Sequence, residues 1–168
     1  MHLFLTGLIG ILSFYKGNWR EWPKYAITIF YVIILNLLYE VLCAEKLLWQ
    51  YIPSGFPKSH VLTALLYTFI ILPGITLMFL SNFPFQQART KQFFYIFKWI
   101  IVSTIIEYIY IYFKKIELNN GYTYWMEPLF YVVMYTMIRL HYTRPFLSYF
   151  LSIIIIITLL QIFDIPLK

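Results

Sequence analysis

The stretch Val61–Leu80 reads VLTALLYTFIILPGITLMFL and contains no charged side chain. A helix needs about 20 apolar residues to cross the hydrocarbon core of a bilayer, and this stretch has that length. The rest of the chain has a similar character, because 61% of its 168 residues are hydrophobic and only 12% are charged. The charged share is about half that of a soluble domain. A soluble fold of this size could not bury so much apolar surface, so the composition indicates an integral membrane protein.

Six apolar segments predict an all-α fold, a polytopic transmembrane helical bundle that forms a single transmembrane domain over residues 1–168. The expected helices span approximately residues 3–15, 25–43, 61–80, 93–113, 124–140 and 146–163. Residues 3–15 are the marginal case, because a helix of that length covers roughly 20 Å of a core about 30 Å thick. We therefore expect six spanning helices, or five if the first segment is interfacial or re-entrant. No basic region precedes that segment and no cleavage site follows it, so we expect it to be retained.

The links between these segments carry turn and cap signals. Ser59 is the expected N-cap of the third helix, and Pro145 falls in the first turn of the last one. Lysines and arginines gather on one set of links. The larger group contains Lys16, Arg20, Lys24, Arg89, Lys91, Lys98, Arg139 and Arg144, and the smaller group contains Lys46, Lys58, Lys114, Lys115 and Lys168. The positive-inside rule places the larger group in the cytoplasm, where Arg139, His141 and Arg144 form a basic anchor.

The net charge of +6 does not indicate a nucleic-acid-binding protein, because the basic residues stand singly between apolar runs. The lipid bilayer is the expected partner. Cys43 is the only cysteine, so no intrachain disulfide can form. We find no catalytic motif, no glycine-rich phosphate loop and no metal-ligand spacing, and we expect no catalytic residue, cofactor or metal.

Glu107 is the most informative single residue, because it lies inside the apolar run Ile105–Ile109 of the fourth segment. A carboxyl group there costs a few kcal/mol on insertion scales and generally faces the bundle interior or a partner. Two interpretations stay open. Glu107 is a proton, cation or ligand site, or it is a structural carboxyl that accepts hydrogen bonds from tyrosines or a neighbouring helix.

Three other polar residues lie toward the same predicted outer side. Asn36 and Glu40 are four residues apart and share one face of the second helix. Glu127 opens the fifth helix, where an acid also suits the helix dipole. If their helices are neighbours, these side chains converge with Glu107 on one outward-facing cavity that suits a cation or an amine. The alternative is that Glu40 and Glu127 are ordinary helix-end residues.

Pro73 and Gly74 interrupt the middle of the third segment. Proline removes one backbone hydrogen bond and bends a helix. Broken helices line the substrate sites of many transporters. In most membrane helices a proline is only a packing kink, and both interpretations stay open.

The chain resembles an uncharacterised family of small multi-spanning membrane proteins from endospore-forming Firmicutes. The residues that carry the resemblance span nearly the whole chain. They are Asn18-Trp19-Arg20, Trp22, Lys24-Tyr25, Pro57, His60, Pro73, Ile106-Glu107, Asn120-Gly121, Arg139-Leu140-His141 and Arg144-Pro145. The resemblance implies a multi-pass protein of the bacterial cytoplasmic or spore membrane, without a known activity, substrate or cofactor. The family tends to have an acid where this chain has Asn18, so no role is assigned to a negative charge there.

Three classes of function remain. The sequence favours a structural subunit or scaffold of a membrane assembly, with a membrane-protein partner or a second copy of the chain. A small carrier or channel that uses Glu107 is the alternative. A membrane enzyme that acts on lipid is the third class, and it lacks a recognisable nucleophile or metal site.

Overall fold

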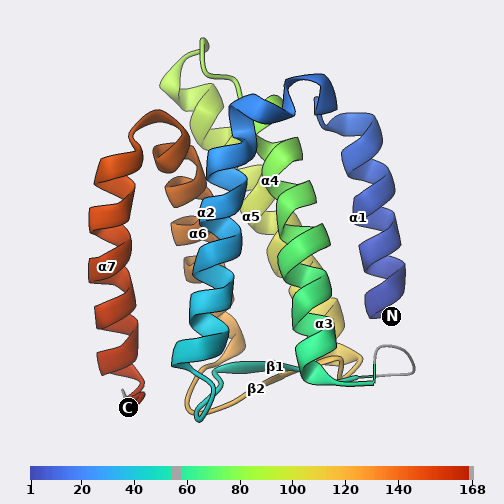
Figure 1. Ribbon diagram of the computed structural model, residues 1–168, viewed down its shortest axis with the longest axis vertical. Helices are drawn as coiled ribbons and strands as arrows, with labels where there is room; N and C mark the ends of the chain where they lie inside the picture. The colour runs from blue at the N-terminus through green and yellow to red at the C-terminus, as the bar shows by residue number, and fades with distance from the viewer. Residues whose placement is uncertain (54–57, 167–168) are drawn as a thin grey trace.

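The computed structural model of the chain describes residues 1–53 and 58–166. Pro57 of the family resemblance and Lys168 of the smaller basic group lie outside the described residues. Six helices form one bundle in this part of the chain, and successive helices run in opposite directions (Figure 1). The helical bundle predicted from the sequence is confirmed, and the crossing of a membrane by all six helices stays a prediction.

Each predicted segment coincides with a helix, and the third is continuous through a change of helix type. The helices are α1 (His2–Lys16), α2 (Trp22–Leu42), α3 (His60–Leu66), the π-helical η2 (Tyr67–Ile71), α4 (Leu72–Ser81), α5 (Arg89–Tyr112), α6 (Glu127–Thr143) and α7 (Pro145–Ile162), and 3₁₀ turns η1 (Trp19–Glu21) and η3 (Tyr124–Met126) precede α2 and α6. Ser59 caps α3 as predicted, because its side chain accepts a hydrogen bond from the Leu62 amide at 3.1 Å.

Four helical segments are long and apolar enough to cross a membrane. They are Trp19–Leu42, His60–Ser81, Arg89–Tyr112 and Pro145–Ile162. The remaining helices, α1 with 15 residues and α6 with 17, are shorter. Helix α1 is nevertheless a full member of the bundle, because it packs along η2 and α4 and does not lie across one end (Figure 1).

A glycine permits the close approach of α1 and α4. A Cβ atom on Gly74 would lie 3.0 Å from Cγ2 of Ile9 and 3.3 Å from Cβ of Ser13. Small residues at such crossings let two helices pack closely where no hydrophobic effect drives them together. The first residues of α1 are also held, because His2 Nε2 lies 3.2 Å from the Ile52 carbonyl and Nδ1 lies 3.1 Å from the Tyr67 hydroxyl.

Pro73 is associated with the π-helical turn η2. Proline lacks the amide that would donate to the carbonyl four residues earlier. The Leu72 amide donates instead to the carbonyl of Tyr67, five residues earlier. Such a turn adds one residue to the helix and changes which side chains face the bundle interior. The predicted irregularity at Pro73 is therefore present, and it lies one turn before the proline.

The two ends of the bundle differ. One end carries both termini and a two-stranded antiparallel sheet, and is called the sheet end (Figure 1). The sheet consists of β1 (Trp49–Tyr51) and β2 (Ile116–Leu118), with Trp49 opposite Leu118 and Tyr51 opposite Ile116. The other end carries the α1–α2, α4–α5 and α6–α7 connections and is called the basic end, because the larger group of lysines and arginines lies there. The sequence did not predict the sheet.

Candidate functional site

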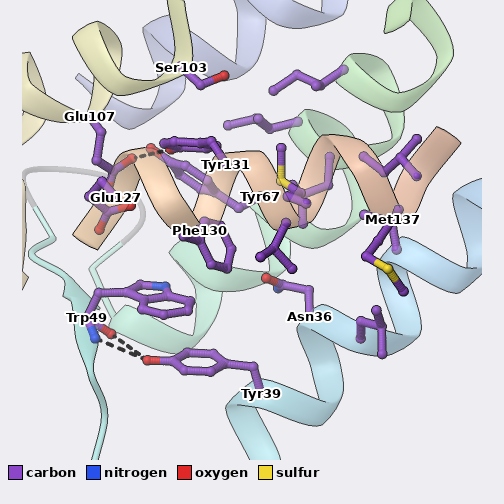
Figure 2. A pocket seen from close by; sticks show the side chains of 18 of the residues that line it. Asn36, Tyr39, Trp49, Tyr67, Ser103, Glu107, Glu127, Phe130, Tyr131 and Met137 are labelled. Atoms are coloured by element: carbon purple, nitrogen blue, oxygen red, sulfur yellow. Dashed lines mark hydrogen bonds between the residues drawn. The ribbon is translucent and has the colours of Figure 1, made fainter. Parts of the chain in front are cut away.

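A cavity of about 280 Å³ lies inside the bundle and extends from its middle toward the sheet end (Figure 2). Helices α1, α2, α5, α6 and α7, the turn η2 and the strand β1 all contribute side chains to its wall. The polar members of the wall are few and include Asn36, Ser103, Glu107, Glu127 and Ser152. A largely apolar cavity with a few polar groups is the usual form of a small-molecule site.

Glu107 projects from α5 into this cavity. Its Oε2 accepts a hydrogen bond of 2.9 Å from the Tyr131 hydroxyl of α6. The side chain is half-buried because part of its surface faces the cavity. Glu107 thus has a tyrosine partner and also lines a cavity, so both interpretations of the sequence stay open.

Glu127 lies beside Glu107, in the first turn of α6 (Figure 2). It is only 4% exposed. Two groups act on its carboxyl: the Glu107 carboxyl by charge repulsion, and the Tyr122 hydroxyl as a hydrogen-bond donor. Neither Glu107 nor Glu127 forms an ion pair with any described residue. Two carboxyl groups therefore share a poorly solvated site without a basic side chain, which favours a proton or a cation between them.

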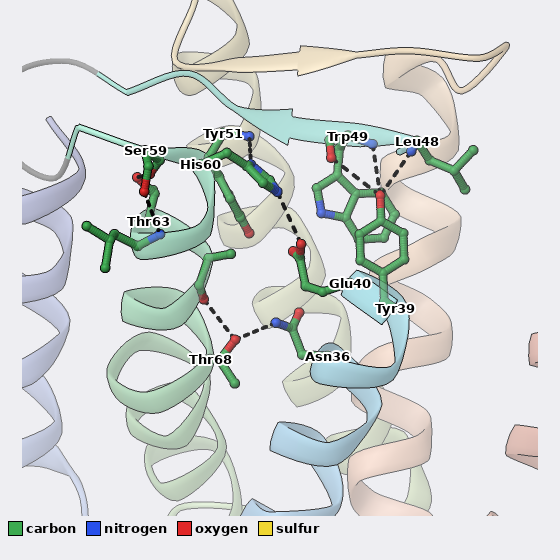
Figure 3. Close-up of polar contacts among 12 residues, drawn as sticks. Asn36, Tyr39, Glu40, Leu48, Trp49, Tyr51, Ser59, His60, Thr63 and Thr68 are labelled. Atoms are coloured by element: carbon green, nitrogen blue, oxygen red, sulfur yellow. Dashed lines mark hydrogen bonds and ion pairs between the residues drawn. The ribbon is translucent and has the colours of Figure 1, made fainter. Parts of the chain in front are cut away.

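Asn36 reaches the same cavity from α2 with a fixed orientation. Thr68 donates its hydroxyl hydrogen to the carbonyl of Ala64 at 2.8 Å, so its oxygen accepts from Asn36 Nδ2 at 2.7 Å (Figure 3). The Oδ1 atom of Asn36 is left without a donor among the described residues. Asn36, Glu107 and Glu127 therefore line one cavity, with Asn36 farther along it than the two acids (Figure 2).

Glu40 does not belong to this cluster, and the prediction that all four residues converge is corrected. Its Oε2 lies 3.1 Å from His60 Nε2, and the Tyr51 amide donates to His60 Nδ1 at 3.1 Å (Figure 3). Because Nδ1 accepts from an amide, Nε2 carries the ring hydrogen that is donated to Glu40. This chain of hydrogen bonds joins α2, α3 and β1, and directs Glu40 away from the cavity.

Aromatic side chains form a large part of the wall near the two carboxyl groups, which the sequence did not reveal. Trp49 of β1 stacks on Tyr39 of α2, with ring centroids 3.9 Å apart and planes within 2°. The ring of Phe130 lies 5.4 Å from that of Trp49. The Tyr39 hydroxyl accepts hydrogen bonds from the amides of Leu48 and Trp49 at 3.0 and 3.1 Å. The position of Trp49 therefore depends on the path of the loop after α2.

Three groups at the sheet end have their pKa raised by burial. They are the hydroxyls of Tyr51 and Tyr122, whose pKa values lie well above the usual range, and the thiol of Cys43, whose pKa is raised to about 11. All three are therefore neutral at physiological pH. The Tyr122 hydroxyl is buried beside Glu127 and interacts with its carboxyl group. Among the described residues, the carboxyl groups of Glu107 and Glu127 therefore have neutral hydroxyl groups as neighbours and no ion pair with a basic side chain.

The cavity wall does not include Pro73 and Gly74 of the predicted kink, nor Arg139, His141 and Arg144 of the predicted basic anchor. Gly74 packs against α1, while Tyr67 and Ile71 of η2 line the cavity. The proline kink therefore affects the cavity indirectly, because the turn η2 that accompanies it places side chains in the cavity wall.

In the basic anchor, Arg139 donates to Oε1 of Gln92 at 2.9 Å, and Arg144 is exposed at the start of α7. The prediction that His141 belongs to this anchor is corrected, because its side chain is only 2% exposed. Its ring stacks on that of Tyr31 with centroids 4.1 Å apart, and its Nδ1 lies 3.0 Å from the Thr28 hydroxyl. His141 therefore joins α6 to α2, and an anchor formed by Arg139 and Arg144 stays a prediction.

No group of three or more histidine, cysteine, aspartate or glutamate side chains within residues 1–53 and 58–166 could hold a metal ion. Comparison of the chain with models of known protein families, with curated proteins and with solved structures gives no match.

Proposed function

We propose that the protein is a small membrane carrier that binds its ligand inside the helix bundle, with Glu107 as the main contact. The observation that carries this proposal is the cavity of about 280 Å³ into which Glu107, Glu127 and Asn36 project without a basic partner. Its volume is close to the lower limit of small-molecule pockets, which range over about 300–1,000 Å³.

The free-energy cost of placing the carboxyl groups of Glu107 and Glu127 inside a membrane supports a ligand-binding role over a purely structural one. A carboxyl group within a membrane costs a few kcal/mol unless a partner compensates it. The hydroxyl groups of Tyr131 beside Glu107 and of Tyr122 beside Glu127 compensate only part of this cost for a pair of acids. The chain itself provides no basic partner for Glu107 and Glu127 among the described residues. A bound ligand supplies that partner.

The cavity has a candidate closure on each side. Toward the sheet end, β1 and the chain formed by Glu40, His60 and Tyr51 cover it. Toward the basic end, hydrogen bonds join neighbouring helices, between Tyr31 and Ser152 at 2.7 Å and between Ser103 and Tyr135 at 2.6 Å. A carrier needs one closure to open while the other holds. The closure toward the basic end consists of side-chain hydrogen bonds, whereas the closure at the sheet end also includes the backbone pairing of β1 with β2.

The four long apolar helices support a membrane location, and the resemblance to a bacterial family suggests the cytoplasmic or spore membrane. The gathering of lysine and arginine supports an orientation with the basic end in the cytoplasm. The cavity then takes its ligand from the outer side, near the sheet end. A membrane-protein partner or a second copy of the chain is compatible with this proposal.

Native mass spectrometry of the purified protein tests the proposal, because it detects any bound molecule by its mass. The wild type is expected to carry a small molecule that the Glu107→Gln variant lacks. Glu40→Gln is the matched control, because Glu40 is a half-buried acid outside the cavity wall, and we expect it to retain the molecule. Identical bare species from wild type and Glu107→Gln would contradict the carrier and favour the scaffold.

A further inference from the structure

We propose that the ligand of this cavity is an amphipathic organic cation, with an ammonium group between Glu107 and Glu127 and an apolar body along the helices. This inference rests on the proposed function and names the class of its ligand. It follows from the hydrogen-bonding capacity, the charge, the ring faces and the apolar surface of the cavity wall.

Two polar groups of the cavity wall, the Glu107 carboxyl and the Asn36 amide, present free acceptor oxygens. Tyr131 donates to one oxygen of Glu107, and the other oxygen has no donor among the described residues. Asn36 uses its amide nitrogen on Thr68 and presents Oδ1. Because carboxylate and amide oxygens accept hydrogen bonds, the ligand has to bring N–H or O–H donors.

The charge of the site selects among such donors. A neutral alcohol or amide satisfies the acceptors but leaves two neighbouring carboxyl groups without a counter-charge. An ammonium group supplies both, and hydrogen bonds between ionised partners are about twice as strong as neutral ones. The cation thus compensates Glu107 and Glu127, for which no described residue provides an ion pair.

The rings around the carboxyl groups favour the same ligand. Figure 2 shows Trp49, Phe130 and Tyr131 around Glu107 and Glu127. Aromatic faces attract cations within about 6 Å of the ring centre, and tryptophan is the strongest of the three ring types in this role. Trp49 is held in place by its stack on Tyr39, so the binding surface is ordered before the ligand enters.

The rest of the cavity accommodates an apolar body. Beyond the acidic end its wall consists largely of aliphatic side chains, among them Leu38 and Leu42 of α2, Met134 of α6, and Ile156 and Leu159 of α7. An inorganic cation leaves this surface without a partner. The volume of about 280 Å³ suits a short alkyl chain or a single ring system.

An ammonium group with an apolar body can come from a free amine or from the headgroup of an aminophospholipid. The phosphate of such a lipid would lie close to Glu107 and Glu127, and like charges repel at that distance in a poorly solvated site. The site therefore favours the free amine.

Three probes with one alkyl chain and different headgroups test the inference: octylammonium, octanol and octanoate at neutral pH. Binding is measured on the protein in phosphatidylcholine nanodiscs, by thermal unfolding and by tryptophan fluorescence, with Trp49→Phe to assign the signal. We expect octylammonium to bind about ten- to a hundredfold more tightly than octanol, the ratio that one or two charge-assisted hydrogen bonds provide. Octanoate is expected not to bind. Glu107→Gln is expected to remove most of the preference, and Glu40→Gln is expected to keep it.

Each outcome separates the inference from the proposed function. Equal binding of octylammonium and octanol, or a preference for octanoate, overturns the cation while a ligand-binding cavity remains. Absence of binding by all three probes, together with no co-purified molecule in native mass spectrometry, overturns both. The series on the wild type decides between these outcomes even if Glu107→Gln does not fold.

Nanodiscs that contain phosphatidylethanolamine distinguish the two sources of the amine. We expect this lipid to leave octylammonium binding unchanged. A loss of about tenfold or more in octylammonium affinity would assign the site to a lipid headgroup and overturn the free amine.

Discussion

At the scale of single residues, the sequence identified the polar side chains of the cavity better than its aromatic ones. Glu107, Glu127 and Asn36 could be predicted because a polar residue in an apolar helix has few places to point. Glu40 has the same signature, but His60, 20 residues away, pairs with it across a loop. The stack of Trp49 on Tyr39 depends on the path of that loop, which no local pattern encodes.

Cys43 provides a test of burial at the sheet end. It lines the cavity just after α2, is 1% exposed, and burial raises its pKa to about 11 from the ordinary value of 9.0. Because only the thiolate is nucleophilic, we expect the folded protein at pH 7 to react with a disulfide reagent about a hundredfold more slowly than a free thiol. The rate is expected to rise with pH up to about 11, as the thiol ionises.

The disulfide 4,4′-dithiodipyridine reports this reaction by absorbance, and the single cysteine makes the signal unambiguous. The same protein in denaturant is the control, where the thiol should react as rapidly as free cysteine. Rapid reaction of the folded protein at pH 7 would show that the cavity wall near Cys43 is open to solvent.

At the scale of elements, the helices followed directly from the apolar runs, whereas the sheet and the π-helical turn did not. The strands β1 and β2 have three residues each, too few to show a period of two. They pair because the helices on either side bring two loops together at the sheet end. The turn η2 follows from Pro73, whose presence predicts a missing hydrogen bond but not the position at which the helix compensates.

The close packing of α1 on α4 at Gly74 leads to a prediction about stability. Gly74→Ala places a Cβ atom 3.0 Å from Ile9, so either α1 shifts or the side chain of Ile9 changes rotamer. We expect a loss of about 1–2 kcal/mol in the free energy of unfolding, as for other overpacked sites. Reversible unfolding in mixed micelles measures it.

Gly10→Ala is the matched control, because a Cβ atom there meets nothing within 4 Å and alanine favours the helix. It should be neutral or slightly stabilising. Equal stability of the two variants would contradict the close packing of α1 on α4.

At the scale of the whole molecule, the sequence predicted the number of helices and the clustering of basic residues, but not the order of the helices. The bundle places α4 between α1 and α2, and α6 between α5 and α7, while α2 also contacts α6. This order decides that Glu107 and Glu127 meet. It depends on contacts between distant helices, which leave no periodic signal in the sequence.

Single cysteines in a Cys43→Ala background test the orientation of the molecule. Glu117 is exposed on β2 at the sheet end, and Gln87 is exposed in the α4–α5 connection at the basic end. In intact cells we expect a membrane-impermeant maleimide to label Glu117→Cys and to leave Gln87→Cys unlabelled until the cells are broken. The reverse pattern would invert the orientation, and labelling of both would contradict two ends on opposite sides of the membrane.

The most direct test of the central claim is the reactivity of the two cavity acids toward a hydrophobic carbodiimide in membranes. Dicyclohexylcarbodiimide modifies carboxyl groups that it reaches through an apolar environment, and peptide mass spectrometry identifies the modified residue. An accessible apolar cavity predicts an adduct on Glu107 or Glu127, with much slower modification of Glu40, which pairs with His60. Adducts confined to exposed acids such as Glu117, with Glu107 and Glu127 unmodified, would contradict a ligand-accessible cavity.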